Sequence, residues 1–201
     1  MSHMMNTKTT TACIIGNGES RKTLNLEALR DVGTIFGCNA LYRDFEPDYL
    51  VAIDDKMIKE IKDTYSNQSR CIFPHENDRY EPPEVYGRTG GPTPRSNAGM
   101  VAMRYAIAMG YNELVCFGFD FLIVDDTMAT SNLYDGTNGY EMETRTVLQD
   151  TRNRMRFLAW LIESNPNVNF VFAYPSEVQV YAPVSDNVKV NLNYEHFRTA
   201  S

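Results

Sequence analysis

The sequence lacks the long apolar run that a membrane-spanning helix needs. Such a helix takes about 20 consecutive apolar residues, and no stretch of this chain approaches that length. The first residues, MSHMMNTKTTT, are polar and lack the apolar segment of a secretory signal, so we expect a cytoplasmic protein. We interpret residues 1–10 as a tag remnant and a disordered N-terminus, and residues 11–201 as a single domain.

Paired cysteines and positive charge are also scarce. The chain has four cysteines, and no two of them form a CxxC pair: Cys13, Cys38, Cys71 and Cys116. This spacing argues against a zinc site and favours buried free thiols in a reducing compartment. The formal net charge is −7, so the general surface repels nucleic acid. Any contact with a phosphate therefore has to come from a local site.

Short apolar runs are what the sequence does contain. Runs typical of strands occur at residues 11–16, 33–38, 48–53, 70–73, 113–119 and 168–174. Helical periodicity is clearest over residues 97–109, and further helices are expected at 54–65 and 143–164. Strands that alternate with helices predict an α/β fold with a mostly parallel sheet and helices on both faces. The segments 74–95 and 120–142 are expected to form long loops, which are often functional.

Polar residues follow several of these strands, at the sheet edge where such folds bind ligands. The first strand ends in Gly16-Asn17-Gly18-Glu19-Ser20, followed by the basic pair Arg21-Lys22. Either this is an ordinary turn, or its backbone amides face an anion. The same edge is expected to carry Asn39, Asp54, Asp55, Ser96, Asn97 and Asp120. Each of them can be a simple cap, but together they predict a polar ligand site.

Three blocks of the chain resemble the bacterial lipooligosaccharide sialyltransferases and their relatives. The blocks are GNGES, GCNALYRDFEPDYLVAIDD and SNAGMVAMRYAIAMGYNELVCFGFDF, and they fall within about residues 11–125. The resemblance implies a variant Rossmann-like fold that binds a nucleotide-activated donor, which is CMP-sialic acid in the sialyltransferases. The wider superfamily also includes archaeal 6-hydroxymethylpterin diphosphokinase-like proteins.

The resemblance also implies a set of substrate-binding residues. The residues of the glycine turn would face the phosphate of the donor or its sugar, Asn39 would meet the nucleotide, and two tyrosines would hold the departing phosphate. The full set is Asn17, Gly18, Ser20, Asn39, Asp54, Arg95, Ser96, Asn97, Gly99, Tyr134 and Tyr140.

The third strand departs from the family pattern. The sialyltransferases have an asparagine where this chain has Asp54-Asp55. A carboxylate near a phosphate is unfavourable unless a cation screens it, so Mg²⁺ becomes conceivable. The two aspartates can instead cap the helix that follows them. We favour capping, and therefore expect no cofactor and no tightly bound metal.

The catalytic base is the second departure. The sialyltransferases use a histidine well after the GxDF strand to deprotonate the acceptor hydroxyl. Beyond Asp120 this chain has only His196, close to the C-terminus, while His75 lies in the first long loop. Asp120 and His75 are therefore the candidate catalytic residues, and we expect Asp120 to matter more.

Three functions are compatible with these residues. The leading hypothesis is a glycosyltransferase-like enzyme from a bacterium or a phage, which uses a nucleotide-activated sugar, with a CMP-sugar favoured, on an unknown acceptor. The first alternative is a Mg²⁺-dependent pyrophosphokinase that uses ATP. The second is a non-catalytic nucleotide-binding protein, which the missing histidine favours. A nucleotide or nucleotide-sugar is the expected ligand, and the possibility of a homo-oligomer stays open.

Overall fold

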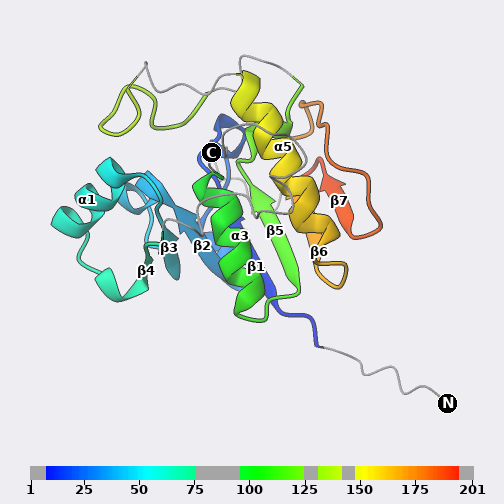
Figure 1. Ribbon diagram of the computed structural model, residues 1–201, viewed down its shortest axis with the longest axis horizontal. Coiled ribbons are helices and arrows are strands. Elements are labelled where there is room, and N and C mark those ends of the chain that lie inside the picture. Colours follow the sequence, from blue (N-terminus) through cyan, green and yellow to red (C-terminus); the bar gives the residue numbers. More distant parts are fainter. Residues whose placement is uncertain (1–7, 76–95, 125–130, 142–147, 195–201) are drawn as a thin grey trace.

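A single parallel sheet organises the protein. The computed structural model describes residues 8–75, 96–124, 131–141 and 148–194 (Figure 1). The strands are β1 (Thr11–Ile15), β2 (Thr34–Cys38), β3 (Tyr49–Val51), β4 (Cys71–Ile72), β5 (Glu113–Phe117), β6 (Asn169–Ala173) and β7 (Val188–Asn191). They form one sheet in the order β4-β3-β2-β1-β5-β6-β7, and every neighbouring pair is parallel. The predicted α/β fold with a parallel sheet is confirmed.

The strand order also fixes where a ligand site is expected. From β3 through β1 to β5 and β7 the order is that of a dinucleotide-binding Rossmann fold, with β4 added at one edge. The direction in which the chain moves across the sheet reverses between β1 and β5, which pair along their whole length. Ligands in such sheets bind outside the carboxyl ends of the strands beside this reversal.

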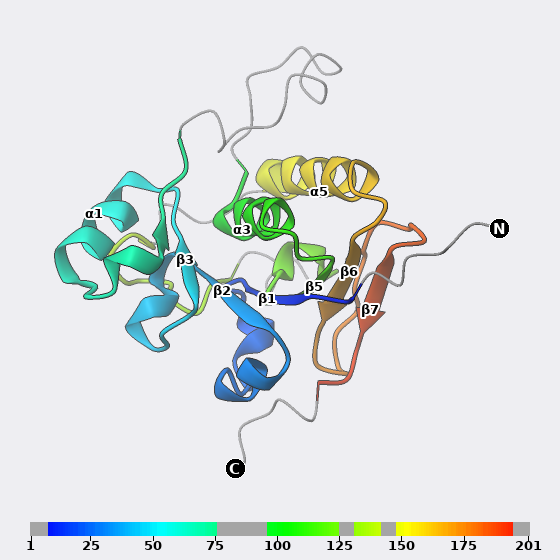
Figure 2. The ribbon, with the colours of Figure 1, turned by 90° about the horizontal axis from the view of Figure 1, so that it is seen from below.

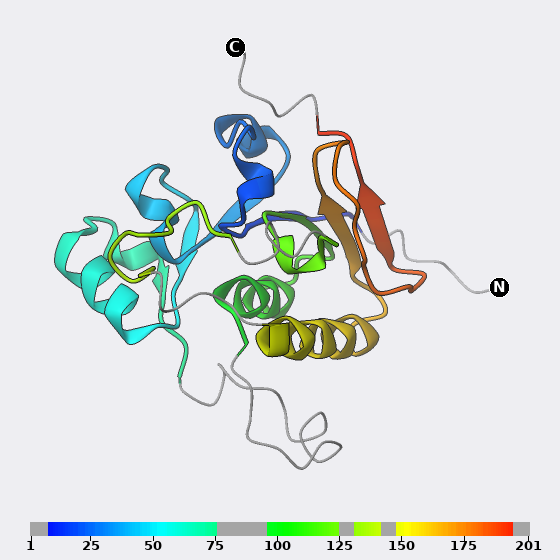
Figure 3. The same ribbon diagram turned by 90° about the horizontal axis from the view of Figure 1, so that it is seen from above.

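Helices cover both faces of the sheet, as the sequence predicted. The helices α3 (Ala98–Ala108) and α5 (Leu148–Glu163) lie together on one face (Figure 2). On the opposite face lie the short 3-10 helix η2 (Glu27–Asp31) and, beside β3, the helix α1 (Asp55–Thr64). The view from above shows the same layers from the other side (Figure 3).

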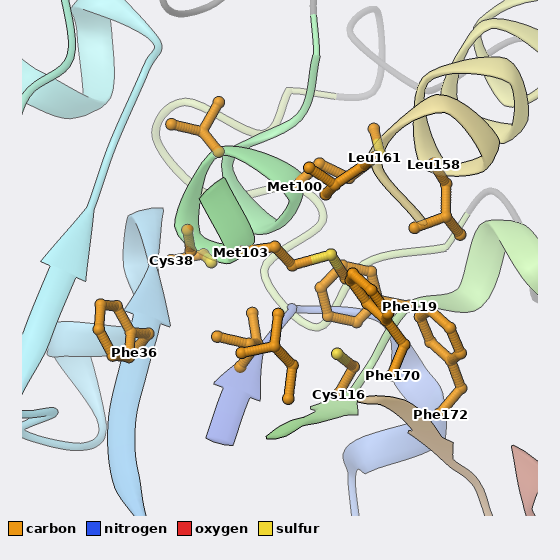
Figure 4. Close-up of a cluster of buried hydrophobic side chains, with 14 of the residues drawn as sticks. Phe36, Cys38, Met100, Met103, Cys116, Phe119, Leu158, Leu161, Phe170 and Phe172 are labelled. Carbon is orange, nitrogen blue, oxygen red and sulfur yellow. The ribbon is translucent and has the colours of Figure 1, made fainter. Parts of the chain in front are cut away.

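The alternation of side chains along the strands builds the core. Strands covered on both faces bury successive residues on opposite sides. One cluster, between the sheet and α3 and α5, includes Phe36, Met100, Met103, Cys116, Phe119, Leu158, Leu161, Phe170 and Phe172 (Figure 4). The opposite face buries Cys13, Ile15, Leu24, Leu29, Ile35, Leu41, Phe117 and Tyr194. α1 packs on β3 through Met57, Ile58 and Ile61. All four cysteines are free thiols, and three of them are buried.

Two segments differ from the expectation, and the last predicted helix is described in part. β7 was not predicted, because its residues are largely exposed and carry no apolar run. The helix expected over 143–164 is described from Leu148 to Glu163, and residues 143–147 lie outside the described part. Residues 1–7 of the predicted disordered N-terminus also lie outside it, but Thr10 donates its amide to Asn112 Oδ1 at 2.8 Å. Over the described ranges, no helix combines the length and apolar character needed to cross a bilayer.

Candidate functional site

A cavity of about 600 Å³ opens at the carboxyl ends of β1, β2, β3 and β5, beside the reversal of strand order. The sequence predicted polar residues at this edge, and most of them line the cavity. The predicted residues found there are Asn17, Gly18, Asn39, Asp54, Ser96, Asn97, Gly99, Asp120 and Tyr140. The position agrees with the general rule for ligand sites in open α/β sheets.

The glycine turn joins the ends of β1 and β5. The Gly16 amide donates to Phe117 O at 2.8 Å, and the Gly18 amide donates to Gly118 O at 3.0 Å. A Cβ on Gly16 would lie 2.8 Å from Gly118 O, so only glycine allows the two strand ends to approach this closely. Both amides already donate to backbone carbonyl groups of the protein. For Gly16 and Gly18 the ordinary-turn interpretation is therefore correct, and these two amides do not face an anion.

Asp120 binds the C-terminal end of the glycine turn, at Ser20. Its carboxylate accepts the Ser20 amide at 2.9 Å and the Ser20 hydroxyl, and only 4% of the residue is exposed. Burial raises the pKa of Asp120 to about 6, although the hydrogen bonds from Ser20 lower it. A Cβ on Gly18 would lie 2.3 Å from the Asp120 carboxyl carbon, so Gly18 makes room for this carboxylate. Ser20 itself does not line the cavity; its side chain and amide fasten the turn to Asp120.

Arg21 is a residue of this site that the sequence analysis did not identify. Its guanidinium is buried behind the turn, where Nε donates to Gly16 O at 2.6 Å and Nη2 donates to Asn17 Oδ1 at 2.9 Å. Asn17 in turn donates its Nδ2 to Cys38 O at 2.9 Å. The Asn17 side chain thus links the ends of β1 and β2. A basic pair after a polar turn is usually solvated, so the sequence carries no signal for this burial.

Asn39 and Tyr140 bring unsatisfied polar atoms to the cavity. Asn39 has a φ of 49°, in the left-handed region that asparagine tolerates better than most residues. Asn39 Oδ1 and Tyr140 Oη are both buried and have no hydrogen-bond partner within the described part of the chain. Burial raises the pKa of Tyr140 to about 12. Hydrogen-bonding contacts of poor geometry, with the side chains of Asn17 and Asn39 and the backbone of Ala40, lower this pKa without satisfying the hydroxyl. Buried polar atoms without partners are rare and call for a specific explanation.

The start of α3 forms another wall of the cavity. Asn97 caps the helix by accepting the Met100 amide at 2.9 Å, so the simple capping interpretation is correct for Asn97. Capping leaves the amides of Ala98 and Gly99 without an intrahelical acceptor, and both residues line the cavity. A Cβ on Gly99 would lie 2.7 Å from the Phe119 ring, so Gly99 permits close packing of α3 on β5. An anion is favoured at such a helix start.

Residues 131–141, here called the strap, complete the lining of the cavity. The strap is tied to the glycine turn because Leu133 donates its amide to Asn17 O at 2.9 Å. Arg43 holds it to α1: the guanidinium pairs with Glu60 at 2.7 Å and donates to Thr137 Oγ1 at 2.8 Å and to Asn138 O at 2.9 Å.

The two tyrosines of the strap lie in different surroundings. Tyr140 lines the cavity. Tyr134 does not: it packs against α1 and β3 and donates its hydroxyl to Asp44 Oδ2 at 2.7 Å. Burial and the bond to Asp44 raise the pKa of Tyr134 to about 12. The expected pair of phosphate-facing tyrosines is therefore reduced to Tyr140 in this structure.

The remaining predicted residues are Asp54, at the cavity, His75, away from it, and two that lie outside the described residues. Asp54 stands at the N-cap position of α1 and at the cavity, but its side chain makes no capping hydrogen bond, contrary to the capping interpretation. His75 is exposed and does not line the cavity. Arg95 and His196 lie outside the described residues. Within the described ranges, no three His, Cys, Asp or Glu residues are grouped to hold a metal ion.

The described rim of the cavity carries more acidic than basic side chains. The acidic residues are Asp54, Asp55, Asp120, Asp135 and Glu141, and the basic ones are Lys56 and Arg154. Lys56 pairs with Glu141 at 3.3 Å, and both side chains are well exposed. A ligand phosphate in this cavity therefore needs stabilisation by positive charge from groups other than the described rim side chains.

The comparisons with known proteins show similarity of fold. No protein-family model and no curated protein matches the sequence. The sialyltransferase CstII from Campylobacter jejuni, in complex with the substrate analogue cytidine-5'-monophosphate, is 14% identical, with 96% of this chain and 88% of that chain covered and a TM-score of 0.50. The monofunctional alpha-2,3-sialyltransferase Cst-I from the same organism is 14% identical over 85% of this chain and 78% of that chain, with a TM-score of 0.47. At 14% identity, the match to CstII shows a similar fold.

Proposed function

We propose that the protein is a glycosyltransferase-like enzyme that binds a nucleotide-activated sugar, with a CMP-sugar as the donor. The observation that carries this proposal is the pair of unsatisfied buried atoms, Asn39 Oδ1 and Tyr140 Oη, at the cavity beside the strand reversal. Leaving a buried polar group unpaired costs about 1–3 kcal/mol. A ligand that donates to Asn39 and accepts from Tyr140 removes that cost.

The phosphate of the donor is assigned to the start of α3. The amides of Ala98 and Gly99 and the positive end of the helix favour an anion there. The hydroxyl of Tyr140 then donates to the departing phosphate, and Asn39 faces the nucleotide, as the sequence resemblance implies. A CMP-sugar carries one charge on its phosphodiester, whereas a nucleoside diphosphate or triphosphate carries more. The acidic rim therefore favours the CMP-sugar over ATP when no cation is present.

Asp120 is assigned as the base that accepts the proton of the acceptor hydroxyl. It lines the cavity, and a pKa of about 6 leaves most of the carboxylate ionised at neutral pH, close to the optimum for a general base. Each carboxylate oxygen accepts one hydrogen bond from Ser20 and keeps a second lone pair for the acceptor. His75, exposed away from the cavity lining, is not needed in this mechanism.

A non-catalytic nucleotide-binding protein is the second candidate. Among the described residues, no histidine lines the cavity, and the only carboxylate with a raised pKa is already bound to Ser20. In this alternative the same cavity binds the nucleotide, but no acceptor is deprotonated.

The test combines binding with turnover. Isothermal titration with CMP, UMP, ADP and ATP, each with and without Mg²⁺, is expected to show CMP binding that does not depend on Mg²⁺. Tyr140→Phe is expected to weaken CMP by about tenfold, because one hydrogen bond to a charged group is lost. Tyr181→Phe is the matched control, since Tyr181 is 72% exposed and lies outside the cavity lining.

Turnover separates the candidates from one another. Release of CMP from CMP-sialic acid, measured by chromatography with a panel of sugar acceptors, supports the transferase. CMP binding without any release supports the non-catalytic protein. Binding of ATP with Mg²⁺, and none of CMP, contradicts the proposal and favours the pyrophosphokinase.

A further inference from the structure

Arg21 is a buried cation that forms no ion pair with a carboxylate of the described residues. Only 7% of the residue is exposed, and its two acceptors, Gly16 O and Asn17 Oδ1, are uncharged. The Tyr134 hydroxyl, which also interacts with the guanidinium, is uncharged as well. Within the described ranges, no carboxylate oxygen lies within the 4.0 Å of an ion pair with Arg21. By contrast, Arg30 pairs with Glu27 at the surface.

A buried charge of this kind needs compensation. Removing an ion from water carries a large penalty, which two neutral acceptors offset only in part. The exposed and paired arginines of the chain do not face this penalty. The position of Arg21 therefore calls for an anion that its charge can stabilise from a short distance.

The positive charge of Arg21 acts on residues at the strand ends that line the floor of the cavity. Both groups that it holds, the Gly16 carbonyl and the Asn17 amide, belong to residues that line the cavity. Burial raises the pKa of Asp120 and of the Cys38 thiol, and the charge of Arg21 opposes that rise at both residues. Asp120 and Cys38 line the cavity at the ends of β5 and β2, so the positive potential spans the floor between them.

We propose that Arg21 is the positioning residue that makes this cavity selective for a phosphorylated ligand. It fixes the Gly16-Asn17 turn through two hydrogen bonds, and it supplies positive potential beneath a described rim on which acidic side chains outnumber basic ones. The inference rests on the proposed function in taking a nucleotide as the ligand. It goes beyond that function because Arg21 follows the GNGES block and has no part in the family resemblance.

The test compares ligands that differ by one phosphate. Binding constants of CMP, UMP, AMP and GMP and of the four corresponding nucleosides are measured by isothermal titration for the wild type, Arg21→Gln, Arg21→Lys and Arg30→Gln. The wild type is expected to prefer at least one monophosphate over its nucleoside. Arg21→Gln is expected to reduce that preference by about tenfold, because the charge is removed. It is expected to weaken the nucleosides less than the monophosphates, because glutamine also cannot replace both hydrogen bonds to the turn. Arg21→Lys is expected to keep most of the preference, and Arg30→Gln all of it.

Each outcome bears on one of the two proposals. If Arg21→Gln weakens nucleoside and monophosphate equally, Arg21 is merely structural and this inference is wrong, while CMP binding by the wild type still supports the proposed function. If the preference is for a monophosphate other than CMP and depends on Arg21, the inference holds and the CMP-sugar assignment is wrong. A wild type that binds no monophosphate overturns the inference.

A measurement on the wild type covers the case in which Arg21→Gln does not fold. The Arg21 Nε–H is held against Gly16 O at 2.6 Å, so its ¹H–¹⁵N signal is expected to be protected from exchange. Addition of the preferred monophosphate is expected to shift this signal, and addition of the nucleoside is not. A signal that responds to both ligands alike, or to neither, contradicts the inference.

Discussion

The substitution Asp120→Asn is expected to stabilise the protein at neutral pH while removing most of the proposed transferase activity. The Asp120 carboxylate is 4% exposed and accepts two hydrogen bonds, both from Ser20. An asparagine has nearly the same shape. Its oxygen can accept the Ser20 amide, and its NH₂ group can donate to the Ser20 hydroxyl. The substitution therefore keeps the fastening of the turn and removes a buried negative charge.

The magnitude follows from the pKa of Asp120. Burial raises it from 3.8 to about 6 in the folded protein. A group whose pKa is raised on folding contributes stability that is fully present below the unfolded value and is lost as the pH rises through the folded value. Each pH unit between the two values is worth about 1.4 kcal/mol, so the wild type loses roughly 3 kcal/mol relative to Asp120→Asn between about pH 4 and about pH 7.

Urea unfolding followed by circular dichroism at several pH values across that window measures this difference directly. Asp31→Asn, which makes the same change at an exposed carboxyl in η2, is the matched control. The free energy of unfolding of Asp120→Asn minus that of the wild type is expected to grow as the pH rises. A difference that shrinks with rising pH would show that Ser20 and Arg21 stabilise the carboxylate more than burial penalises it. The raised pKa, on which the assignment of Asp120 as a base rests, would then be contradicted.

Three further expectations concern the cavity. Gly16→Ala is expected to lower the free energy of unfolding by about 1–3 kcal/mol, because the new Cβ meets the Gly118 backbone at 2.8 Å; urea unfolding checks this value, and an unchanged stability would contradict the close approach. Arg43→Lys is expected to weaken nucleotide binding severalfold, because lysine cannot hold Glu60 and two strap groups together; Arg30→Lys is the control in the same titration. EDTA is expected to leave nucleotide affinity unchanged in both the wild type and Asp54→Asn, whereas a loss confined to the wild type would identify a metal site and favour the pyrophosphokinase.

The sequence predicted the sheet because central parallel strands are buried on both faces. The apolar runs that contain Ile14, Cys116 and Phe170 are typical of strands buried on both faces, so these runs alone were sufficient to predict the central strands. The edge strand β7 carries no such signal, since most of its side chains face solvent and, among its residues, Val188 alone packs against the core. The formation of such an edge strand depends mainly on pairing with its neighbour, and its own residues give little signal for it.

The candidate site was predictable in position but not in detail. Because carboxyl ends of parallel strands share one edge, Asn17, Asn39 and Asp120 had to come together. Which groups face the ligand depends on hydrogen bonds that form across the sheet. The Gly16 amide is taken by Phe117 O, a residue about a hundred positions away in the sequence, and no local pattern indicates this. The burial of Arg21 has the same origin.

The glycine turn therefore combines two buried charges that do not pair with each other. Arg21 lies on the side of Gly16 and Asn17, and Asp120 lies on the side of Gly18 and Ser20. A turn that served the fold alone would be satisfied as well by an asparagine at position 120 and a neutral donor at position 21. Both charges carry a desolvation penalty, and the two hydrogen bonds that each makes are available to uncharged side chains. Two buried charges under these conditions fit the proposed roles, in which Arg21 favours a ligand phosphate and Asp120 accepts a proton close to neutral pH.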